Sequence, residues 1–359
     1  MKYEDFINST KYRREYDEIL SLGFNCHTST SLRQAGLQCK SYPLDWVRFV
    51  DINEQSCETG FMRLIELICT NFKDFINEQD LYIYSDNREE EKDPYIIVYN
   101  SFNGMRYRHD FPKGKTITES YSEVKEKYDR RIKRLMDLIN SDKKVCFVFY
   151  SGVAKLPKAG IMYSTEMFYK IFPKRNVDFL ILQNDLDIGD EVVYEELSDN
   201  IRHISFYNGP YSEDFQGNIY NISLRIKQVS CAVVTNSKPK KFLAQRLNSI
   251  YHQNDIITNP TPDFTGMVSF GPYTCLLKGK HNVTVDFELT ENYRAFFDIC
   301  DNFGDILIPK IELPHNKNQF KFDFHLDKCA GNLEVRFYCE PIEKIDENNK
   351  FQLFGIQID

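Results

Sequence analysis

The sequence lacks most of the motifs that identify common classes of protein. No GxxxxGK[ST] or GxGxxG loop is present, so no nucleotide-binding loop is expected. No HxH, HExxH or Cys/His cluster occurs at ligand spacing, and we expect neither a metal nor another cofactor. The formal charge is −8 and no basic stripe is present, which disfavours nucleic acid as a partner.

Long apolar segments are also missing. The charged N-terminus has no apolar core of the kind found in signal peptides. The longest apolar run, at residues 145–150, suits a buried strand and is too short to span a membrane. The ten cysteines include no CxxC pair. We therefore expect a cytoplasmic protein with reduced thiols and no membrane span, while its oligomeric state stays open.

The length of 359 residues exceeds one ordinary core and favours two domains. Short apolar strands are expected at 145–150, 177–182, 203–207 and 231–235, with helical segments such as 163–171 between them. This alternation predicts an α/β domain over residues 1–254, with a mostly parallel sheet and helices on both faces. Residues 241–251 are expected to form its closing helix.

Two further elements are expected before that alternation begins. Residues 95–99 and 105–111 are typical of two strands joined by an Asn103-Gly104 turn. An amphipathic helix is expected over 121–140.

The pattern changes after Asn259-Pro-Thr-Pro262, which we interpret as a linker. Residues 283–289, 320–326 and 333–339 alternate apolar and polar side chains, as strands with one buried face do. Residues 255–359 are therefore expected to form an all-β sandwich.

Cys26 is the strongest candidate for chemistry. Residues 19–22 are expected to form a strand, Gly23 a turn, and Asn25 the N-cap of a helix that ends at Gly36. This arrangement places Cys26 in the first turn of a helix, where the dipole and free amides lower a thiol pKa. We therefore expect a reactive thiolate. The alternative is one more buried structural cysteine among ten.

His109 is the expected base, because it lies at the end of a predicted strand near a turn. Asp45 or Asp110 could orient its ring; Asp110 would face the other side of a regular strand, which favours Asp45 slightly. Taken without context, Asp45 is more commonly a turn or N-cap carboxylate. Expected substrate contacts come from the backbone amides of Asn25 and His27, and from the ring of Trp46.

The segments Ser21-Leu-Gly-Phe-Asn-Cys26, Leu32-Arg33 and Ser41-Tyr-Pro-Leu-Asp-Trp46 resemble the opening signature of a bacterial family of papain-like cysteine peptidases, a domain of unknown function. Arg108-His-Asp-Phe111 resembles its second block, and the likeness covers about residues 17–240; Leu44 replaces the usual Phe. It implies a Cys–His thiol enzyme with Cys26, His109 and an acidic partner, and adds Arg33 as a substrate contact.

Two alternatives remain open for the fold and the substrate. A papain-like fold is the alternative to the α/β sheet, and the strand–turn–Cys order also resembles SGNH-type esterases. Gly271 to Gly279 resemble the start of β-sandwich modules on bacterial enzymes of surface-glycan assembly. We therefore expect a cysteine-dependent acyl-transfer enzyme, hydrolysing or forming an ester or amide on a surface-glycan or glycoconjugate precursor such as capsule polysaccharide. The rival hypothesis is a non-catalytic glycan-binding or scaffold protein.

Overall fold

The computed structural model describes residues 1–23, 26–49, 58–84, 94–152, 155–209, 215–237, 239–302, 304–342 and 349–359. Its contacts divide the chain into two compact units. Unit 1 comprises Met1–Tyr3, Tyr16–Leu32 and Gln38–Ile226, and unit 2 comprises Glu4–Glu15, Arg33–Leu37 and Lys227–Asp359. The units divide elsewhere than at the expected boundary of 254/255, because strands that precede the linker belong to unit 2.

The first sheet of unit 1 is mixed, which corrects the expectation of a mostly parallel sheet. In the described residues its order is β2 (Glu18–Ser21), β7 (Val145–Ser151), β8 (Val177–Asn184), β10 (Ile201–Phe206) and β9 (Val192–Ser198). The pairs β2–β7, β7–β8 and β8–β10 are parallel, but β9 is antiparallel to β10. Only Asp199 and Asn200 separate β9 from β10. So short a connection permits only an antiparallel pair.

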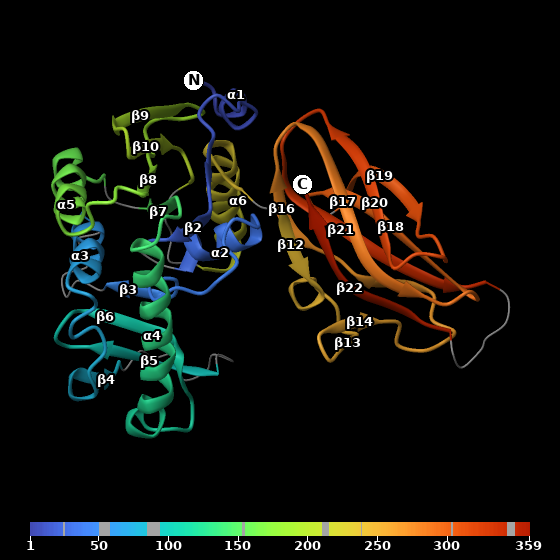
Figure 1. The fold of residues 1–359 in the computed structure, drawn as a ribbon, viewed down its shortest axis with the longest axis horizontal. Helices are drawn as coiled ribbons and strands as arrows, with labels where there is room; N and C mark the ends of the chain where they lie inside the picture. The colour runs from blue at the N-terminus through green and yellow to red at the C-terminus, as the bar shows by residue number, and fades with distance from the viewer. Residues whose placement is uncertain are drawn as a thin grey trace. The chain divides into compact units, whose positions relative to one another are not determined.

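Both faces of the central strands are covered, since every residue of β7 and β8 is buried. One face packs against three helices: α3 (Glu58–Cys69), α4 (Ile117–Ile139) and α5 (Lys158–Ile171). Phe147 of β7 and Phe179 of β8 contact each other and the ring of Phe168 on α5. Figure 1 shows α3, α4 and α5 beside these strands. The expected helices at 121–140 and 163–171 are thus confirmed, and each begins a few residues earlier than expected.

A second sheet of unit 1 is antiparallel throughout. Its order is β3 (Val47–Phe49), β6 (Met105–Pro112), β5 (Tyr95–Asn100) and β4 (Leu81–Ile83), after a short 3₁₀ turn η1 (Glu78–Asp80). The expected hairpin is confirmed: Gly104 adopts φ +71° and its amide donates to the carbonyl of Asn100 at 2.9 Å. This sheet and the first share one apolar core.

Unit 2 is a β-sandwich, as expected. One sheet has the order β13 (His252–Gln253), β14 (Ile256–Thr258), β22 (Phe351–Ile358), β17 (Gly279–Leu289) and β20 (Gln319–Leu326), with β12 (Lys240–Leu243) also paired to β22. The other has the order β15 (Gly266–Ser269), β21 (Ala330–Pro341), β18 (Tyr293–Asp301) and β19 (Asp305–Glu312), with β16 (Pro272–Leu276) also paired to β21. The alternate apolar residues of both sheets form one core.

The expected helix over 241–251 is wrong. Residues 240–243 form β12, and only the 3₁₀ turn η2 (Ala244–Arg246) is helical. Phe242 is buried and lies opposite Ile356 of β22, while Lys241 and Leu243 are exposed. A burial period of two residues belongs to a strand. The expected strand over 231–235 is shifted, because α6 (Phe215–Val233) continues to residue 233 and β11 (Val234–Asn236) pairs with β1 (Arg14–Tyr16).

Candidate functional site

Cys26 is the first residue of α2 (Cys26–Gln34), directly beyond the carboxyl end of β2. The chain leaves the sheet at Leu22, whose amide donates to the carbonyl of Val148 on β7 at 2.8 Å. Gly23 then turns at φ +88°, and the Thr28 hydroxyl donates to its carbonyl at 3.2 Å. The expected strand–turn–helix order is therefore confirmed. Asn25, the expected N-cap and oxyanion residue, lies outside the described residues.

The surroundings of the thiol contradict the expectation of a lowered pKa. Burial raises the pKa of the Cys26 thiol, against the opposing effects of the Arg108 guanidinium, the Cys26 amide and the Arg48 guanidinium. The helix terminus and two cations therefore reduce the desolvation effect without cancelling it. Cys26 rests as a protonated, half-buried thiol.

His27 differs from Cys26 in being fully enclosed. Burial, with the nearby Arg48 guanidinium, lowers the pKa of the His27 imidazole from 6.5 to about 4. A buried, neutral imidazole of this kind is a poor base at neutral pH. Contact of its backbone amide with a substrate stays a prediction.

His109 lies on a bulge of β6. Along β5 the step from Ile96 to Val98 is matched on β6 by the longer step from Phe111 to Tyr107, so β6 carries extra residues here. The bulge breaks the alternation: Arg108 and His109 are both half-buried, whereas Asp110 and Phe111 are both buried. Bulges often re-aim side chains next to active sites. No local sequence pattern predicts this bulge.

Two aromatic rings pack against the His109 imidazole. The rings of Trp46 and Tyr95 lie edge-on to the imidazole, with centroids 6.0 and 6.4 Å away. Arg108, the next residue along β6, is the cation with the largest effect on Cys26. Trp46 is thus in contact with His109, whereas the pairing of His109 with Cys26 stays a prediction.

The two candidate orienting carboxylates have other partners. Asp110 faces α4, where it accepts from the Tyr128 hydroxyl at 2.8 Å and pairs with the Lys127 ammonium at 2.7 Å. The carboxylate therefore joins β6 to α4, and a role for Asp110 in orienting His109 stays a prediction. Asp45 accepts from the Tyr42 amide at 2.9 Å and from the Gln38 side chain at 2.9 and 3.0 Å. With these contacts, Asp45 acts as a carboxylate that stabilises a turn.

Gln38 is a residue that sequence reasoning missed. Its side-chain oxygen accepts from the amide of Ser21, the last residue of β2, at 2.9 Å, while its nitrogen donates to Asp45. It therefore fixes the Asp45 turn to the strand that leads to Cys26. Arg33 lies seven residues after Cys26, about 10 Å along the helix axis, in the part of α2 assigned to unit 2. The structure does not bring it to the thiol.

A row of side chains crosses the antiparallel sheet towards the thiol. Tyr82 lies opposite Tyr99, Tyr99 opposite Arg106, and Arg106 opposite Arg48. Directly opposed residues share one face of a sheet. Tyr84 joins this face, with the Arg106 guanidinium 5.6 Å from its ring centroid. On the other face Val47, Val98 and Tyr107 are buried in the core. The row, which the sequence analysis did not identify, ends at a cation that acts on Cys26.

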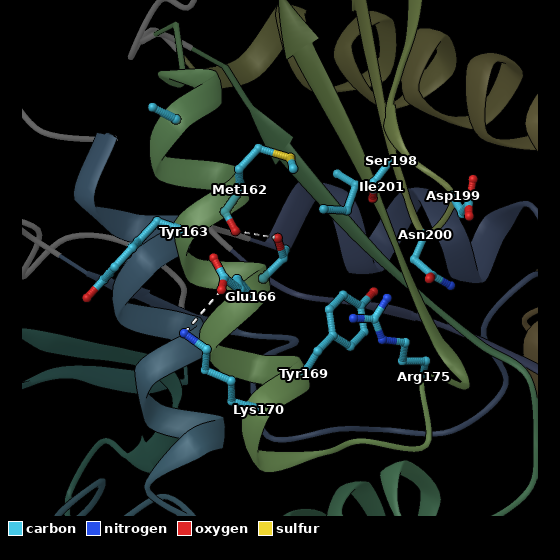
Figure 2. A pocket seen from close by; sticks show the side chains of 12 residues that line it. Met162, Tyr163, Glu166, Tyr169, Lys170, Arg175, Ser198, Asp199, Asn200 and Ile201 are labelled. Carbon is cyan, nitrogen blue, oxygen red and sulfur yellow. Dashed lines mark hydrogen bonds and ion pairs between the residues drawn. The ribbon is translucent and has the colours of Figure 1, made fainter.

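A cavity of about 700 Å³ lies elsewhere in unit 1, between α5 and the β9–β10 turn. Figure 2 shows Tyr169 and Arg175 on one side of it, with the guanidinium 5.4 Å from the ring centroid, and Met162 and Tyr163 on α5. Its sheet residues, Ser198 to Ile201, precede β10, whereas Cys26 follows the carboxyl end of β2. The cavity is therefore not part of the Cys26 site.

No group of three or more His, Cys, Asp or Glu side chains is arranged to hold a metal ion in the part of the chain that the structure describes. Within the same residues, no helix has both the length and the apolar character needed to cross a bilayer.

Comparison with known proteins supports the expected resemblance for the first part of the chain. Residues 17–158 match a family described as "Putative papain-like cysteine peptidase". The chain is also similar to an uncharacterized protein of Acanthamoeba polyphaga mimivirus, with 30% identity over 138 residues. That match spans 36% of this chain and only 59% of the viral protein. The relative is viral, so it gives no support to a bacterial origin.

Solved structures resemble the chain only distantly. The sugar-binding C-terminal domain of EclA has 14% identity and a TM-score of 0.22, covering 32% of this chain and 83% of that one. The C-terminal CBM6 of LamC from Zobellia galactanivorans has 13% identity and a TM-score of 0.21, covering 34% and 98%. Likenesses at these TM-scores carry no argument about fold or function.

Proposed function

We propose that unit 1 is a cysteine-dependent hydrolase or acyltransferase in which Cys26 is the nucleophile and His109 the base. One observation supports this most directly: Cys26 starts a helix beyond the carboxyl end of β2, and its strongest cationic neighbour is Arg108, which adjoins His109 on the bulge. Ligands of open α/β sheets commonly bind at that edge.

Because burial raises the pKa of the Cys26 thiol, the proposed reaction starts from the protonated thiol. The thiol stays protonated until a substrate is bound, and His109 then accepts its proton as sulfur attacks the carbonyl carbon. The C=O electron pair moves to oxygen and returns as the C–N or C–O bond breaks. The leaving group takes the proton from the imidazolium. Water or an acceptor hydroxyl or amine then releases the acyl group from Cys26.

The two guanidiniums have a role in this scheme. Arg108 and Arg48 both stabilise negative charge at Cys26, so they would favour the thiolate as it forms. The row of Tyr82, Tyr99, Arg106 and Arg48 extends from this point. Guanidiniums bind carboxylate and phosphate, and rings stack on sugar faces or planar groups. This row supports a substrate that carries an anionic group.

A surface-glycan or glycoconjugate precursor, modified in the cytoplasm of a bacterium, is the narrower form of the proposal. Its support is the resemblance of residues 271–279 together with the aromatic and cationic row. An SGNH-like esterase is the alternative enzyme for the same strand–turn–helix. In such an esterase, Cys26 would occupy the position of the nucleophile.

A non-catalytic scaffold remains the second candidate. The raised pKa of the Cys26 thiol favours it, because a protonated and half-buried cysteine is the ordinary state of a structural one. The two hypotheses differ in what an acyl donor does to Cys26.

The test is acylation by an activated ester such as p-nitrophenyl acetate, followed by peptide mass spectrometry. We expect a transient acyl group on Cys26 and little on Cys39, an exposed thiol that serves as the internal reference. Cys26→Ala should abolish turnover. His109→Ala should slow acylation by about 10²–10⁴-fold, the usual contribution of a general base.

His325→Ala is the matched control, because His325 is an exposed histidine of unit 2, and it should leave the rate unchanged. Circular dichroism shows whether each variant is folded, and Cys26→Ser replaces Cys26→Ala if the latter is not. Equal acylation of Cys26 and Cys39, or full activity without His109, would overturn the proposal and favour the scaffold.

A further inference from the structure

Three cysteines of unit 2 lie close together, although they are far apart in the sequence. Cys231 is near the end of α6, Cys275 is on β16, and Cys329 is in the turn before β21. The sulfurs of Cys275 and Cys329 are 3.7 Å apart. The Cys231 thiol lies 3.8 Å from the carbonyl oxygen of Cys275. Cys275 therefore lies between two other cysteines.

Two ammonium groups border the same thiols. Lys240 donates to the carbonyl of Cys275 at 2.7 Å and lies 3.9 Å from the Cys231 sulfur. Lys227 donates to the Tyr273 carbonyl at 3.0 Å and to the Asn332 side chain at 2.6 Å. The oxygen acceptors of both ammonium groups are thus uncharged carbonyl and amide oxygens. Contact with Cys275 and burial nevertheless raise the pKa of the Cys231 thiol well above its usual value, and the Lys240 ammonium opposes this rise. The pKa of the Cys275 thiol is raised as well.

The other cysteines of the sandwich are different. Cys339 is buried and contacts the Tyr293 hydroxyl at 3.4 Å, and Cys300 is buried in β18. For neither does the structure give a second thiol in contact. Sharing of a metal ion does not explain the cluster either, because the described residues hold no suitable group of three. The 3.7 Å contact between the Cys275 and Cys329 sulfurs does permit chemistry between these two sulfurs.

Solvent exposure favours oxidation of the Cys275–Cys329 pair over the Cys231–Cys275 pair. Cys329 is 8% exposed, while Cys275 and Cys231 are 0% and 1% exposed. A small oxidant can thus reach Cys329 before the other two. The amide of Cys329 donates to the Asn8 side chain at 2.9 Å, which fixes this turn within unit 2.

We propose that Cys275 and Cys329 are a redox site, which forms a reversible disulfide when a hydroperoxide oxidises Cys329. This site is independent of the proposed chemistry at Cys26.

The steps balance with one molecule of hydrogen peroxide. The Cys329 sulfur attacks one peroxide oxygen and gives up its proton, the O–O bond breaks, and the hydroxide that leaves takes up this proton as water. This gives the sulfenic acid of Cys329. The Cys275 sulfur attacks the Cys329 sulfur, the S–O bond breaks, and the second hydroxide leaves with the Cys275 proton. Two thiols and one peroxide thus give one disulfide and two waters. A dithiol reverses the reaction by exchange.

The bond would join two segments that pair irregularly. β16 lies beside β21, but the register shifts between Pro272 and Thr274 and again between Thr274 and Leu276. A covalent link from Cys275 to the turn before β21 closes a long loop between residues 275 and 329. Oxidation should therefore raise the Tm of unit 2.

The test uses the full chain carrying Cys26→Ala, which removes the candidate nucleophile as a competing thiol. Brief treatment with hydrogen peroxide should lower the intact mass by two hydrogen atoms. Digestion without reductant should yield one peptide pair joined through Cys275 and Cys329, and dithiothreitol should restore the mass. The Tm should be higher in the oxidised sample than in the reduced one.

Cys329→Ser should abolish the linked peptides and the rise in Tm, and Cys275→Ser should do the same if it folds. Cys300→Ser is the matched control and should change neither. A link from Cys231 to Cys275 in place of the expected one would overturn the assignment of the pair. Unpaired overoxidation of Cys329, or no mass change at all, would overturn the redox site.

Discussion

The two units place cysteine in opposite settings. In unit 1, Cys26 is half-buried at the start of a helix, with the Arg108 and Arg48 guanidiniums acting on it. In unit 2, Cys275 and Cys329 are buried side by side at a strand and a turn. The same side chain thus starts a helix in one unit and lies beside another thiol in the other. Reactivity towards an acyl donor and towards an oxidant should separate accordingly.

The comparison extends to the buried bases of each unit. Burial lowers the pKa of His27 from 6.5 to about 4 in unit 1, and that of Lys227 from 10.5 to about 8 in unit 2. Both groups are more easily protonated in the unfolded chain, so each reduces stability at pH values below its unfolded pKa. The stability change caused by His27 falls between about pH 6.5 and 4, and the change caused by Lys227 falls between about pH 10.5 and 8. The units should therefore differ in the pH range over which their stability changes.

The largest effect should come from His27. Its contribution is fully present above about pH 6.5 and is lost as the pH falls through about 4, with a total of about 3 kcal/mol. The measurement is the free energy of unfolding by urea between pH 4 and 7. His27→Gln should flatten this dependence. An unchanged slope in the variant would mean that other groups cause the acid sensitivity.

Lys227 should act on the alkaline side with no larger effect. Its contribution is present above about pH 10.5 and is lost as the pH falls through about 8, again about 3 kcal/mol at most. Buried tyrosines and thiols act in the opposite direction there, so the useful quantity is the difference between wild type and Lys227→Met. That difference should change with pH between 8 and 10.5. A constant difference would show that Lys227 titrates normally.

Asp110 offers a sharper test of which carboxylate belongs to the site. Asp110→Asn weakens the contacts with Lys127 and Tyr128, and should cost about 1–3 kcal/mol of stability while leaving acylation of Cys26 unchanged. Asp129→Asn is the control on the same helix; its exposed pair with Lys125 should be worth about 0.5 kcal/mol or less. A large loss of acylation with little loss of stability would instead assign Asp110 to the site.

The smallest expected effect is that of Arg108 on the Cys26 thiol. Alkylation by iodoacetamide should rise with pH beyond the range of an ordinary thiol, because burial raises the pKa of Cys26. Arg108→Ala should raise that pKa further and slow alkylation at fixed pH by up to about tenfold, equivalent to one pKa unit. Cys39 in the same sample is the reference. Arg106→Ala, on the same strand, should leave the Cys26 rate unchanged if Arg108 is the cation that matters.

Much of the fold was predictable because its signals are local. The strand–turn–helix around Cys26 depends on apolar residues 19–22 and on the positive φ of Gly23. The sandwich strands depend on a strict alternation of apolar residues. The antiparallel β9 was missed, since a two-residue Asp199-Asn200 turn between polar strands carries little apolar pattern. β12 was missed because Lys241 to Leu243 sit between longer elements and fit a helix equally well.

The candidate site was predictable only in part, and for a related reason. Cys26 and His109 could be chosen by residue type and position, and Trp46 is in contact with His109. The Arg108–His109 bulge, the Gln38 bridge and the row from Tyr82 to Arg48 each depend on pairing between strands. The register between two strands depends on both strands, so it cannot be predicted from the sequence of one of them.

The sequence by itself determined the order of the elements, the change from an α/β to an all-β pattern, and the position of Cys26 at a helix start. Secondary-structure propensity and hydrophobic periodicity act over neighbouring residues, which makes these features predictable. Tertiary structure alone decided the state of each thiol. Burial outweighs the helix terminus at Cys26 and raises its pKa. The sulfurs of Cys275 and Cys329 come within 3.7 Å of each other only when β16 and β21 pair. Desolvation and contact across distant segments have no local signature, so the chemistry of these cysteines appears only in the folded chain.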